Sequence, residues 1–243
     1  AKDEAEKYSD ETFELFEQRQ QLLGNSYPFE VDGNIIASTA SAATSTYLFC
    51  LGLSLLPSVP NDMRTRLFEA IAKEAAELYF RGEGVRIGAP WRTGKITDYA
   101  KLLQLVTNLI PELGKPVRTA APGGGDFGWD IVIVNNFADR LFSRIIALGN
   151  CATGSTNWRT KGNETEAEYF WDGFSVPPER KNVCIRFLAV PFHMTKDDKD
   201  RKQSRDNVLF DRIRISHLAP NASRAALQWV ERNRSLALDI SLI

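Results

Sequence analysis

An aspartate and an asparagine stand at the ends of two apolar segments of this 243-residue chain. Asp130 directly precedes the run IVIV, and Asn150 closes the run RIIALGN. A carboxylate at the entrance of so apolar a strand needs a partner, because an uncompensated buried charge is costly. Oxygen ligands from neighbouring strand ends suit a hard cation such as Mg²⁺, which activates water and neutralises phosphate charge. These two positions therefore predict hydrolysis of a phosphodiester.

Side-chain alternation along the second segment determines which residues share the face of Asp130. Successive side chains of a strand point to opposite faces, so Asn150 and Ala152 are expected to project together beside Asp130. Cys151 then points to the opposite, buried face, and no histidine is close to it in the sequence. A structural thiol is therefore favoured over a nucleophile.

Three apolar segments of the second half predict the strands that must position these residues. They begin near Ile131, Arg144 and Val183, and they are rich in β-branched residues and nearly continuous in apolar character. Such segments are typical of central strands that are buried on both faces. The polar and aromatic stretch 158–174 is long enough for a crossover helix between the second strand and the third.

Helical patterns fill the first half of the chain and return near its end. The expected helices cover residues 11–23, a segment that ends at Leu56, residues 62–79, residues 97–110 and residues 223–234. Helices followed by a small sheet with a crossover helix indicate an α/β fold. We expect residues 1–60 to form a helical N-terminal extension that packs on an α/β core of residues 61–243.

The stretch from Gly123 to Lys161 resembles the metal-binding core of a restriction-endonuclease-like nuclease of the PD-(D/E)xK type. An acid opens one strand, a tripeptide similar to (E/Q)xK closes the next, and a helix is expected after it. GWDIVIV and ALGNCATGSTNWRTK are similar to a group of bacterial nucleases associated with defence against foreign DNA. YPF at 27–29 and DRIR at 211–214 extend the resemblance. It implies a restriction-endonuclease-like core, with a small mixed central sheet flanked by helices.

The resemblance also implies a set of metal ligands. Asp130 and Asn150 would bind Mg²⁺ or Mn²⁺ together with the backbone carbonyl of Cys151. Family members often place a further glutamate on the amphipathic helix, which points to Glu69, with Glu74 as the second choice. A solvated helix surface is the alternative for either glutamate.

Two departures from the family pattern bear on activity. Ala152 stands where the family has its catalytic lysine. Asn150 stands where the group usually has glutamine, and its neutral side chain is a weaker metal ligand than a carboxylate. We expect Lys161 to replace the missing lysine, because a helix capped by Asn157 or Thr156 would hold it in its first turn, near the strand end. An exposed helix lysine is the alternative.

Two functions stay open at this point. The first is a Mg²⁺-dependent DNA endonuclease that acts in defence against phage or foreign DNA. The second is a catalytically degenerate nuclease fold that serves as a DNA-binding or protein-interaction module. A position of Lys161 close to Asp130 favours the first, and double-strand cutting would call for a homodimer or a partner protein of the defence system.

Other residues of the chain have ordinary structural interpretations beside the functional ones. Trp129 and Trp158 flank the expected site and could stack on bases, although tryptophans are more common in cores. Arg212 and Arg214 could contact phosphate or pair with local acids. The charged run KDDKDRKQSRD is expected to form a solvated loop.

Composition narrows the classes of protein to which the chain can belong. A net charge of -1 lacks the global basic signature of an avid nonspecific nucleic-acid binder, but it leaves local patches open. Three cysteines without a close pair and the polar, acidic start AKDEAEKYSDE predict a cytoplasmic protein. The longest apolar run, 47–56, is about half the length that crosses a bilayer, so no membrane partner is expected.

Overall fold

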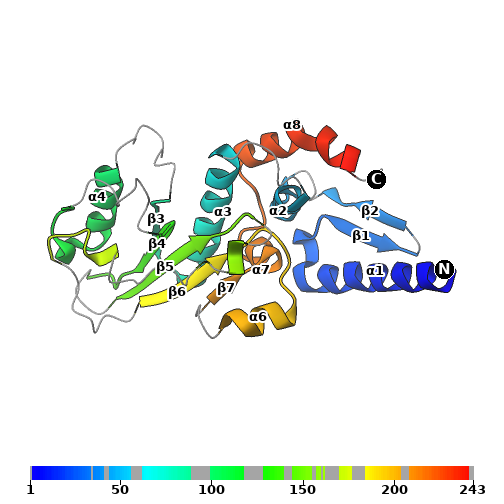
Figure 1. Ribbon diagram of the computed structural model, residues 1–243, viewed down its shortest axis with the longest axis horizontal. Helices are drawn as coiled ribbons and strands as arrows, with labels where there is room; N and C mark the ends of the chain where they lie inside the picture. The colour runs from blue at the N-terminus through cyan, green and yellow to red at the C-terminus, as the bar shows by residue number, and fades with distance from the viewer. Residues whose placement is uncertain are drawn as a thin grey trace.

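A mixed five-stranded sheet forms the centre of the computed structural model (Figure 1). Its strands are β3 (Glu83–Arg86), β4 (Ile131–Asn135), β5 (Ile145–Cys151), β6 (Cys184–Ala189) and β7 (Val208–Phe210), paired in that order. β4 is antiparallel to both β3 and β5, whereas β6 runs parallel to β5 and β7 runs parallel to β6. The structure describes residues 2–33, 35–40, 44–55, 62–88, 99–117, 128–139, 144–154, 157–159, 161, 170–176, 184–203 and 208–240.

Helices cover both faces of this sheet. The α-helices are α1 (Lys2–Leu23), α2 (Thr46–Leu55), α3 (Asp62–Phe80), α4 (Tyr99–Leu109), α6 (Lys196–Gln203), α7 (Arg212–Leu218) and α8 (Arg224–Ile240). α2, α3, α7 and α8 share one apolar core with the sheet, and α4 packs in a second core on the other face. The structure therefore confirms the predicted α/β fold with a small mixed central sheet flanked by helices.

The apolar run IVIV forms a central strand because each face of it meets a different helical layer. Ile131 and Ile133 pack in the core that contains α3, whereas Val132 and Val134 pack in the core that contains α4. A strand that is buried on both faces has no need of alternating polar residues. This arrangement confirms the prediction that the segments beginning near 131 and 144 are buried central strands.

The N-terminal part combines the expected helices with a strand pair that was not expected. The 3-10 helix η1 (Gly24–Ser26) ends α1, and β1 (Phe29–Asp32) then pairs with β2 (Ile35–Ser38) in an antiparallel hairpin. The alternating sequence FEVD explains β1, because its apolar and polar residues point to opposite faces. The hairpin lies beside α1 at the end of the molecule opposite α4 (Figure 1). The boundary at residue 60 stays a prediction.

An aromatic cluster joins this N-terminal part to α2 and α7. Tyr27 and Tyr47 are buried, with ring centroids 5.0 Å apart in an edge-to-face arrangement. The Arg212 guanidinium lies over the Tyr47 ring, 5.1 Å from its centroid, and the side chain is only 7% exposed. Arg212 is therefore a packing residue and is not available as a phosphate contact.

The expectation of a solvated loop at KDDKDRKQSRD is wrong for most of that run, because residues 196–203 form α6. Local contacts explain the helix. Thr195 Oγ1 accepts a hydrogen bond from the backbone N–H of Asp198, as an N-terminal cap does, and Lys196 Nζ lies 2.6 Å from Asp200 Oδ2 one turn later. The crossover helix predicted within 158–174 lies mostly outside the described residues. Near its expected start, the structure has the 3-10 helix η5 (Asn157–Arg159).

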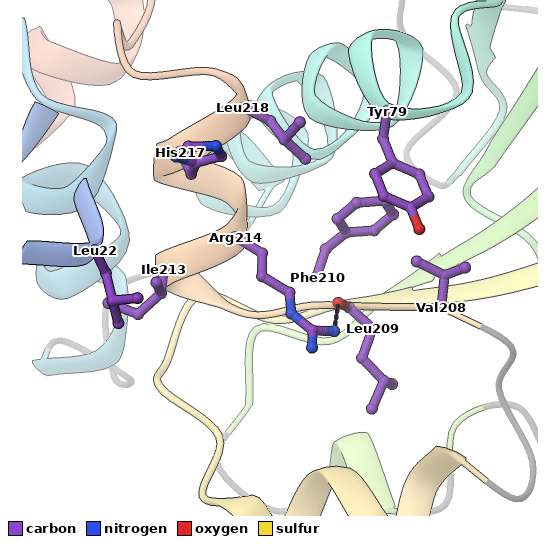
Figure 2. Close-up of a pocket in the computed structure, with 9 residues that line it drawn as sticks. All are labelled: Leu22, Tyr79, Val208, Leu209, Phe210, Ile213, Arg214, His217 and Leu218. Carbon is purple, nitrogen blue, oxygen red and sulfur yellow. Dashed lines mark hydrogen bonds between the residues drawn. The ribbon is translucent and has the colours of Figure 1, made fainter. Parts of the chain in front are cut away.

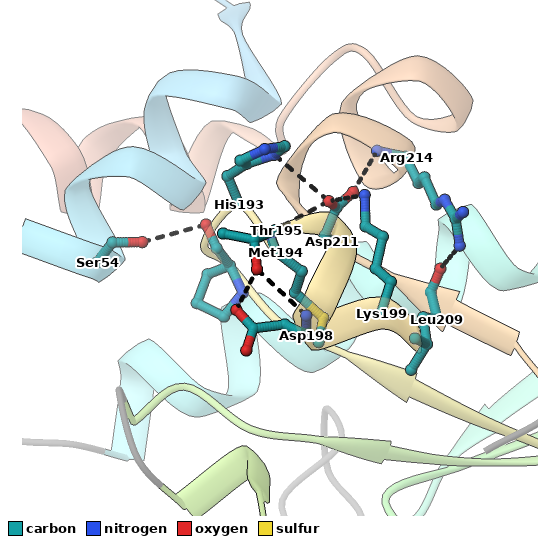
Figure 3. Close-up of polar contacts among 10 residues, drawn as sticks. Ser54, His193, Met194, Thr195, Asp198, Lys199, Leu209, Asp211 and Arg214 are labelled. Carbon is teal, nitrogen blue, oxygen red and sulfur yellow. Dashed lines mark hydrogen bonds and ion pairs between the residues drawn. The ribbon is translucent and has the colours of Figure 1, made fainter. Parts of the chain in front are cut away.

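Asp211 is a completely buried carboxylate that joins three segments of the C-terminal half (Figure 3). Its Oδ1 accepts the backbone N–H of Arg214 and so caps α7, while its Oδ2 lies 2.7 Å from Lys199 Nζ and 3.5 Å from His193 Nδ1. Burial by itself raises the pKa of Asp211, but the contacts with His193 and Lys199 outweigh it and hold the pKa well below its ordinary value.

Helices in the described part of the chain are not membrane spans, because none is both long enough and apolar enough to cross a bilayer.

The substitution Asp211→Asn should cost about 1 to 3 kcal/mol of unfolding free energy at neutral pH, the usual range for a lost charge-assisted hydrogen bond. A lowered folded-state pKa means that the ionised carboxylate adds stability above the unfolded-state value of about 3.9. That contribution is lost as the pH falls through the folded-state pKa. Urea unfolding at a series of pH values should therefore show the difference between parent and variant shrinking below about pH 4.

The exposed pair Lys196–Asp200 provides the matched control, because Asp200→Asn removes a carboxylate from the same region at little expected cost. A difference between Asp211→Asn and the parent that stays constant from neutral to strongly acidic pH would contradict the role given to the ionised Asp211.

The substitution Gly149→Ala should destabilise the sheet, because a Cβ at this position of β5 would overlap the ring of Phe187. Overpacking of this kind costs about 1 to 3 kcal/mol. In Gly52→Ala, by contrast, the new Cβ would lie 3.7 Å from Trp229, which is ordinary contact, and alanine is the better helix former. Denaturant midpoints should fall for Gly149→Ala and hold or rise for Gly52→Ala, and equal midpoints would contradict this packing.

Candidate metal centre

Three strand ends meet at the position of Asp130. The register pairs Ile131 with Arg86 of β3 on one side and with Gly149 of β5 on the other. The backbone N–H of Asp130 donates to the Gly149 carbonyl at 2.9 Å. The start of β4 therefore lies beside the end of β5, as the sequence predicted, and the end of β3 flanks it on the other side.

Two buried carboxylates converge at Gly88, just after β3. Glu69 of α3 is 1% exposed and Asp130 is 6% exposed. A Cβ on Gly88 would lie 2.6 Å from Asp130 Oδ1 and 3.0 Å from each carboxylate oxygen of Glu69. Both carboxylates thus reach to within 3.0 Å of one point, which stays open because residue 88 has no side chain. Glu74, the second choice from the sequence, lies on an exposed part of α3.

A bulge in the sheet accompanies this convergence. The backbone N–H groups of Ile87 and Gly88 both donate to the carbonyl of Asp130, at 2.7 Å and 3.0 Å. Two residues opposite one is the pairing of a β-bulge, which bends a strand and redirects side chains next to functional sites. The bulge brings the backbone of Gly88 against the two carboxylates.

Hydrogen bonds from fixed groups orient each carboxylate. The backbone N–H of Cys151 donates to Asp130 Oδ2 at 2.6 Å. The Arg86 guanidinium donates to Glu69 Oε2 at 2.5 Å and to the carbonyl of Gly88 at 2.9 Å. Arg86 is itself 8% exposed, so this ion pair is shielded from water. These contacts fix the orientation of both carboxylates in the structure.

Asn150 brings a buried oxygen that lacks a partner. Its side chain is 2% exposed, and its Nδ2 donates to the carbonyl of Gly128. Its Oδ1 has no hydrogen-bond partner among the residues that the structure describes. Because a buried acceptor without a partner is costly, this oxygen is available to a ligand.

The other two residues of the tripeptide are buried, and Cys151 lies on the α3 side with the carboxylates, not on a face away from Asp130 as predicted. Cys151 packs in the core that contains α3, and Ala152 packs with Trp158 and Leu188 in a separate small cluster. Burial first, and then the charges of Asp130 and Glu69, raise the pKa of the Cys151 thiol well above its ordinary value. The thiol is therefore protonated at neutral pH and is not a nucleophile.

Lys161 is half-buried in a turn after η5. Together with Arg86, it lowers the pKa of the Cys151 thiol against the effects of burial and of the two carboxylates. Its carbonyl accepts a hydrogen bond from Lys202 Nζ at 2.6 Å, and Lys202 is only 3% exposed. The α-helix expected from a cap at Asn157 or Thr156, with Lys161 in its first turn, is not seen at its start, because residues 157–159 form the 3-10 helix η5 and Lys161 lies in a turn. Residues 162–169 lie outside the described part of the chain.

The donor set fits a hard divalent cation. Across the described ranges, no three His, Cys, Asp or Glu side chains come together in a group that could hold a metal ion. Mg²⁺ commonly needs only one or two carboxylates, because waters and substrate phosphates complete its coordination. At Gly88, Glu69 and Asp130 provide two carboxylates.

Both tryptophans beside the centre are core residues. Trp129 is 1% exposed and packs against the α4 layer, and Trp158 is 5% exposed beside Phe192. Neither offers a ring face to a base, so the core interpretation of these residues holds.

A separate cavity of about 490 Å³ lies along β7, away from the carboxylates (Figure 2). Arg214 lines it and donates from its guanidinium to the carbonyl of Leu209 at 2.7 Å. The lining is mostly apolar and consists of Leu22, Tyr79, Val208, Leu209, Phe210, Ile213, Arg214, His217 and Leu218. No carboxylate lines it, which sets it apart from the candidate metal centre.

Arg86 and Gly88 belong to the centre, although neither was expected from the sequence. The segment GEGVRIG carries the signal that could have found them. An arginine between two apolar residues predicts a short strand, in which the arginine side chain points to one face and the side chains of the two apolar residues point to the other. A buried arginine on such a strand then requires an acid partner, which is Glu69.

No family model and no curated protein matches the chain. Among solved structures, it is similar to the MspJI restriction endonuclease in complex with a 27-mer oligonucleotide, with a TM-score of 0.36 and 12% sequence identity. The match covers 89% of this chain and 38% of that endonuclease chain.

The substitution Gly88→Ala should weaken Mn²⁺ binding by about 10- to 100-fold, the range observed when groups that orient metal ligands are changed. The added Cβ would push against Asp130 Oδ1 and both oxygens of Glu69. Isothermal titration calorimetry with Mn²⁺ measures the effect, and Gly52→Ala, in a helix remote from these carboxylates, is the control. An affinity equal to that of the parent would show that a metal ion, if bound, lies elsewhere.

Proposed function

We propose that this chain is a metal-dependent phosphodiesterase that cuts DNA, with Glu69 and Asp130 as ligands of Mg²⁺ or Mn²⁺. The convergence of these two buried carboxylates at Gly88 is the observation that supports the proposal most directly. Two like charges buried so close together destabilise a fold unless a cation neutralises them. DNA is proposed as the substrate because GWDIVIV and ALGNCATGSTNWRTK are similar to bacterial defence nucleases with a restriction-endonuclease-like core.

Each residue near the centre has a proposed role. A bound Mg²⁺ would supply Lewis-acid activation of water and neutralise phosphate charge. Glu69 and Asp130 would hold the ion, and the Cys151 amide fixes the orientation of Asp130. The Oδ1 of Asn150 and the carbonyl of Cys151 are proposed as further oxygen ligands. Lys161 would orient the attacking water or neutralise the phosphate, replacing the lysine that is missing at position 152.

The biological setting is part of the same proposal. We propose a role in defence against phage or foreign DNA in the cytoplasm, where such DNA arrives. A domain with one centre cuts one strand at a time, so double-strand cutting would require a homodimer or a partner protein of the defence system.

A second candidate function is a catalytically degenerate module that binds DNA or protein without cutting. The packing of Ala152 favours it, because this residue is 1% exposed within an apolar cluster where the family has its lysine. The module and the enzyme differ in one outcome: the module binds DNA with every divalent cation and cleaves it with none.

Nicking of supercoiled plasmid with Mg²⁺ or Mn²⁺ separates the two functions. We expect Asp130→Asn and Glu69→Gln to slow cutting by about 100-fold or more, because each removes a charge that stabilises the transition state through the metal. Lys161→Ala should slow it about 10- to 100-fold. Glu74→Gln is the matched control, because it changes an exposed glutamate of the same helix.

DNA binding without cutting by the parent under either metal would support the module and exclude the enzyme. Cutting by Asp130→Asn at the rate of the parent would show that the activity belongs to another part of the protein.

A further inference from the structure

Arg86 forms a buried ion pair with a carboxylate of the proposed metal centre. Its Nη1 lies 2.5 Å from Glu69 Oε2, with the two side chains 7% and 1% exposed. The same atom donates to the carbonyl of Gly88 at 2.9 Å. The guanidinium therefore occupies one oxygen of a carboxylate whose two oxygens both face Gly88.

The charges of the centre explain why a cation is needed there when no metal ion is bound. Glu69 and Asp130 are both buried and both reach to within 3.0 Å of one point. In surroundings of low dielectric constant their mutual repulsion and their desolvation oppose folding. Arg86 supplies a positive charge beside Glu69, so it stabilises the metal-free fold.

The same contact must oppose metal binding. A divalent cation bound at Glu69 lies close to the guanidinium on Oε2, so the two cations repel each other and compete for the charge of the same carboxylate. Because a guanidinium has five N–H donors, Arg86 can keep its bond to the Gly88 carbonyl while it yields Glu69 Oε2. Metal binding therefore exchanges one counter-ion for another without removing Arg86 from the centre.

We propose that Arg86 is an internal counter-ion that stabilises the empty centre and competes with the divalent cation for Glu69, so that it sets the metal affinity. This inference rests on the proposed function, because it takes Glu69 as a metal ligand. Arg86 is a positioning residue: it acts on the reaction through the occupancy of the metal centre.

The test is Arg86→Met, which keeps an unbranched side chain and removes the charge. Isothermal titration calorimetry with Mn²⁺ alone should show binding on the order of tenfold tighter than in the parent. Thermal unfolding in EDTA should occur at a lower temperature than for the parent, and saturating Mn²⁺ should raise the variant's unfolding temperature by more than it raises the parent's.

The control is Arg144→Met, because Arg144 is also a buried arginine in an ion pair, 2.6 Å from Glu112, and lies at the other end of β5. It should lower stability without changing the Mn²⁺ affinity. The double variant Arg86→Met with Glu69→Gln removes both charges of the pair and should fold, and it should lose the gain in affinity, because that gain depends on the Glu69 carboxylate.

Each outcome distinguishes this inference from the proposed function. If the parent binds Mn²⁺ and Arg86→Met binds it equally or more weakly, the counter-ion role is wrong and the metal centre stands. If neither protein binds Mn²⁺, both proposals are wrong. If Arg86→Met folds only in the presence of Mn²⁺, the exchange of counter-ions is supported. If Arg86→Met does not fold even with Mn²⁺, while the double variant does fold, the exchange is overturned.

Discussion

The two buried carboxylates of Glu69 and Asp130 must be neutralised where β3, β4 and β5 meet, and the packing of this end of the sheet depends on it. Glu69 lies on a helix and Asp130 at the start of a strand far along the chain, and the bulge after β3 brings the backbone of Gly88 against both. Arg86 on one side and the Cys151 amide on the other each hold one carboxylate. Without these partners the desolvation of the acids would oppose the packing of α3 on the sheet.

The rest of the architecture keeps this polar centre enclosed. The strand β4 is apolar on both faces, and Asp130 lies directly before it, while Glu69 approaches from α3. Asp211, which follows the edge strand β7, is also a buried acid. The N-terminus of α7 and Lys199 supply its hydrogen bonds and its opposite charge. Asp211 contacts side-chain cations and caps a helix, whereas Asp130 and Glu69 lie on either side of the space at Gly88.

Sequence patterns predicted the parts of the fold that depend on local periodicity. The helices over residues 62–79 and 97–110 and the strands beginning near 131 and 144 follow from apolar spacing, and the structure confirms them. The position of Asp130 beside the end of the next strand also follows, because antiparallel neighbours bring the start of one strand to the end of the other.

What the sequence could not show depends on partners that are distant along the chain. The bulge at Gly88 and the ion pair of Arg86 with Glu69 arise only when β3 pairs with β4 under α3. The helix α6 was mistaken for a loop because its stability comes from a cap and from ion pairs one turn apart, and it has no apolar stripe. The roles of Asn150, Lys161 and the Cys151 carbonyl as ligands or catalytic groups stay predictions.

The residues of the centre are far apart in the sequence, and this separation affects how fast the centre can form. Its groups come from residue 69, residues 86–88, residue 130 and residues 150–151, so none of them is assembled by a local turn or a single hairpin. Contacts of such long sequence separation form slowly, because loop closure must precede them. A cation that needs all of these groups would not bind a partly folded chain. Its binding would therefore begin only once the five-stranded sheet has formed.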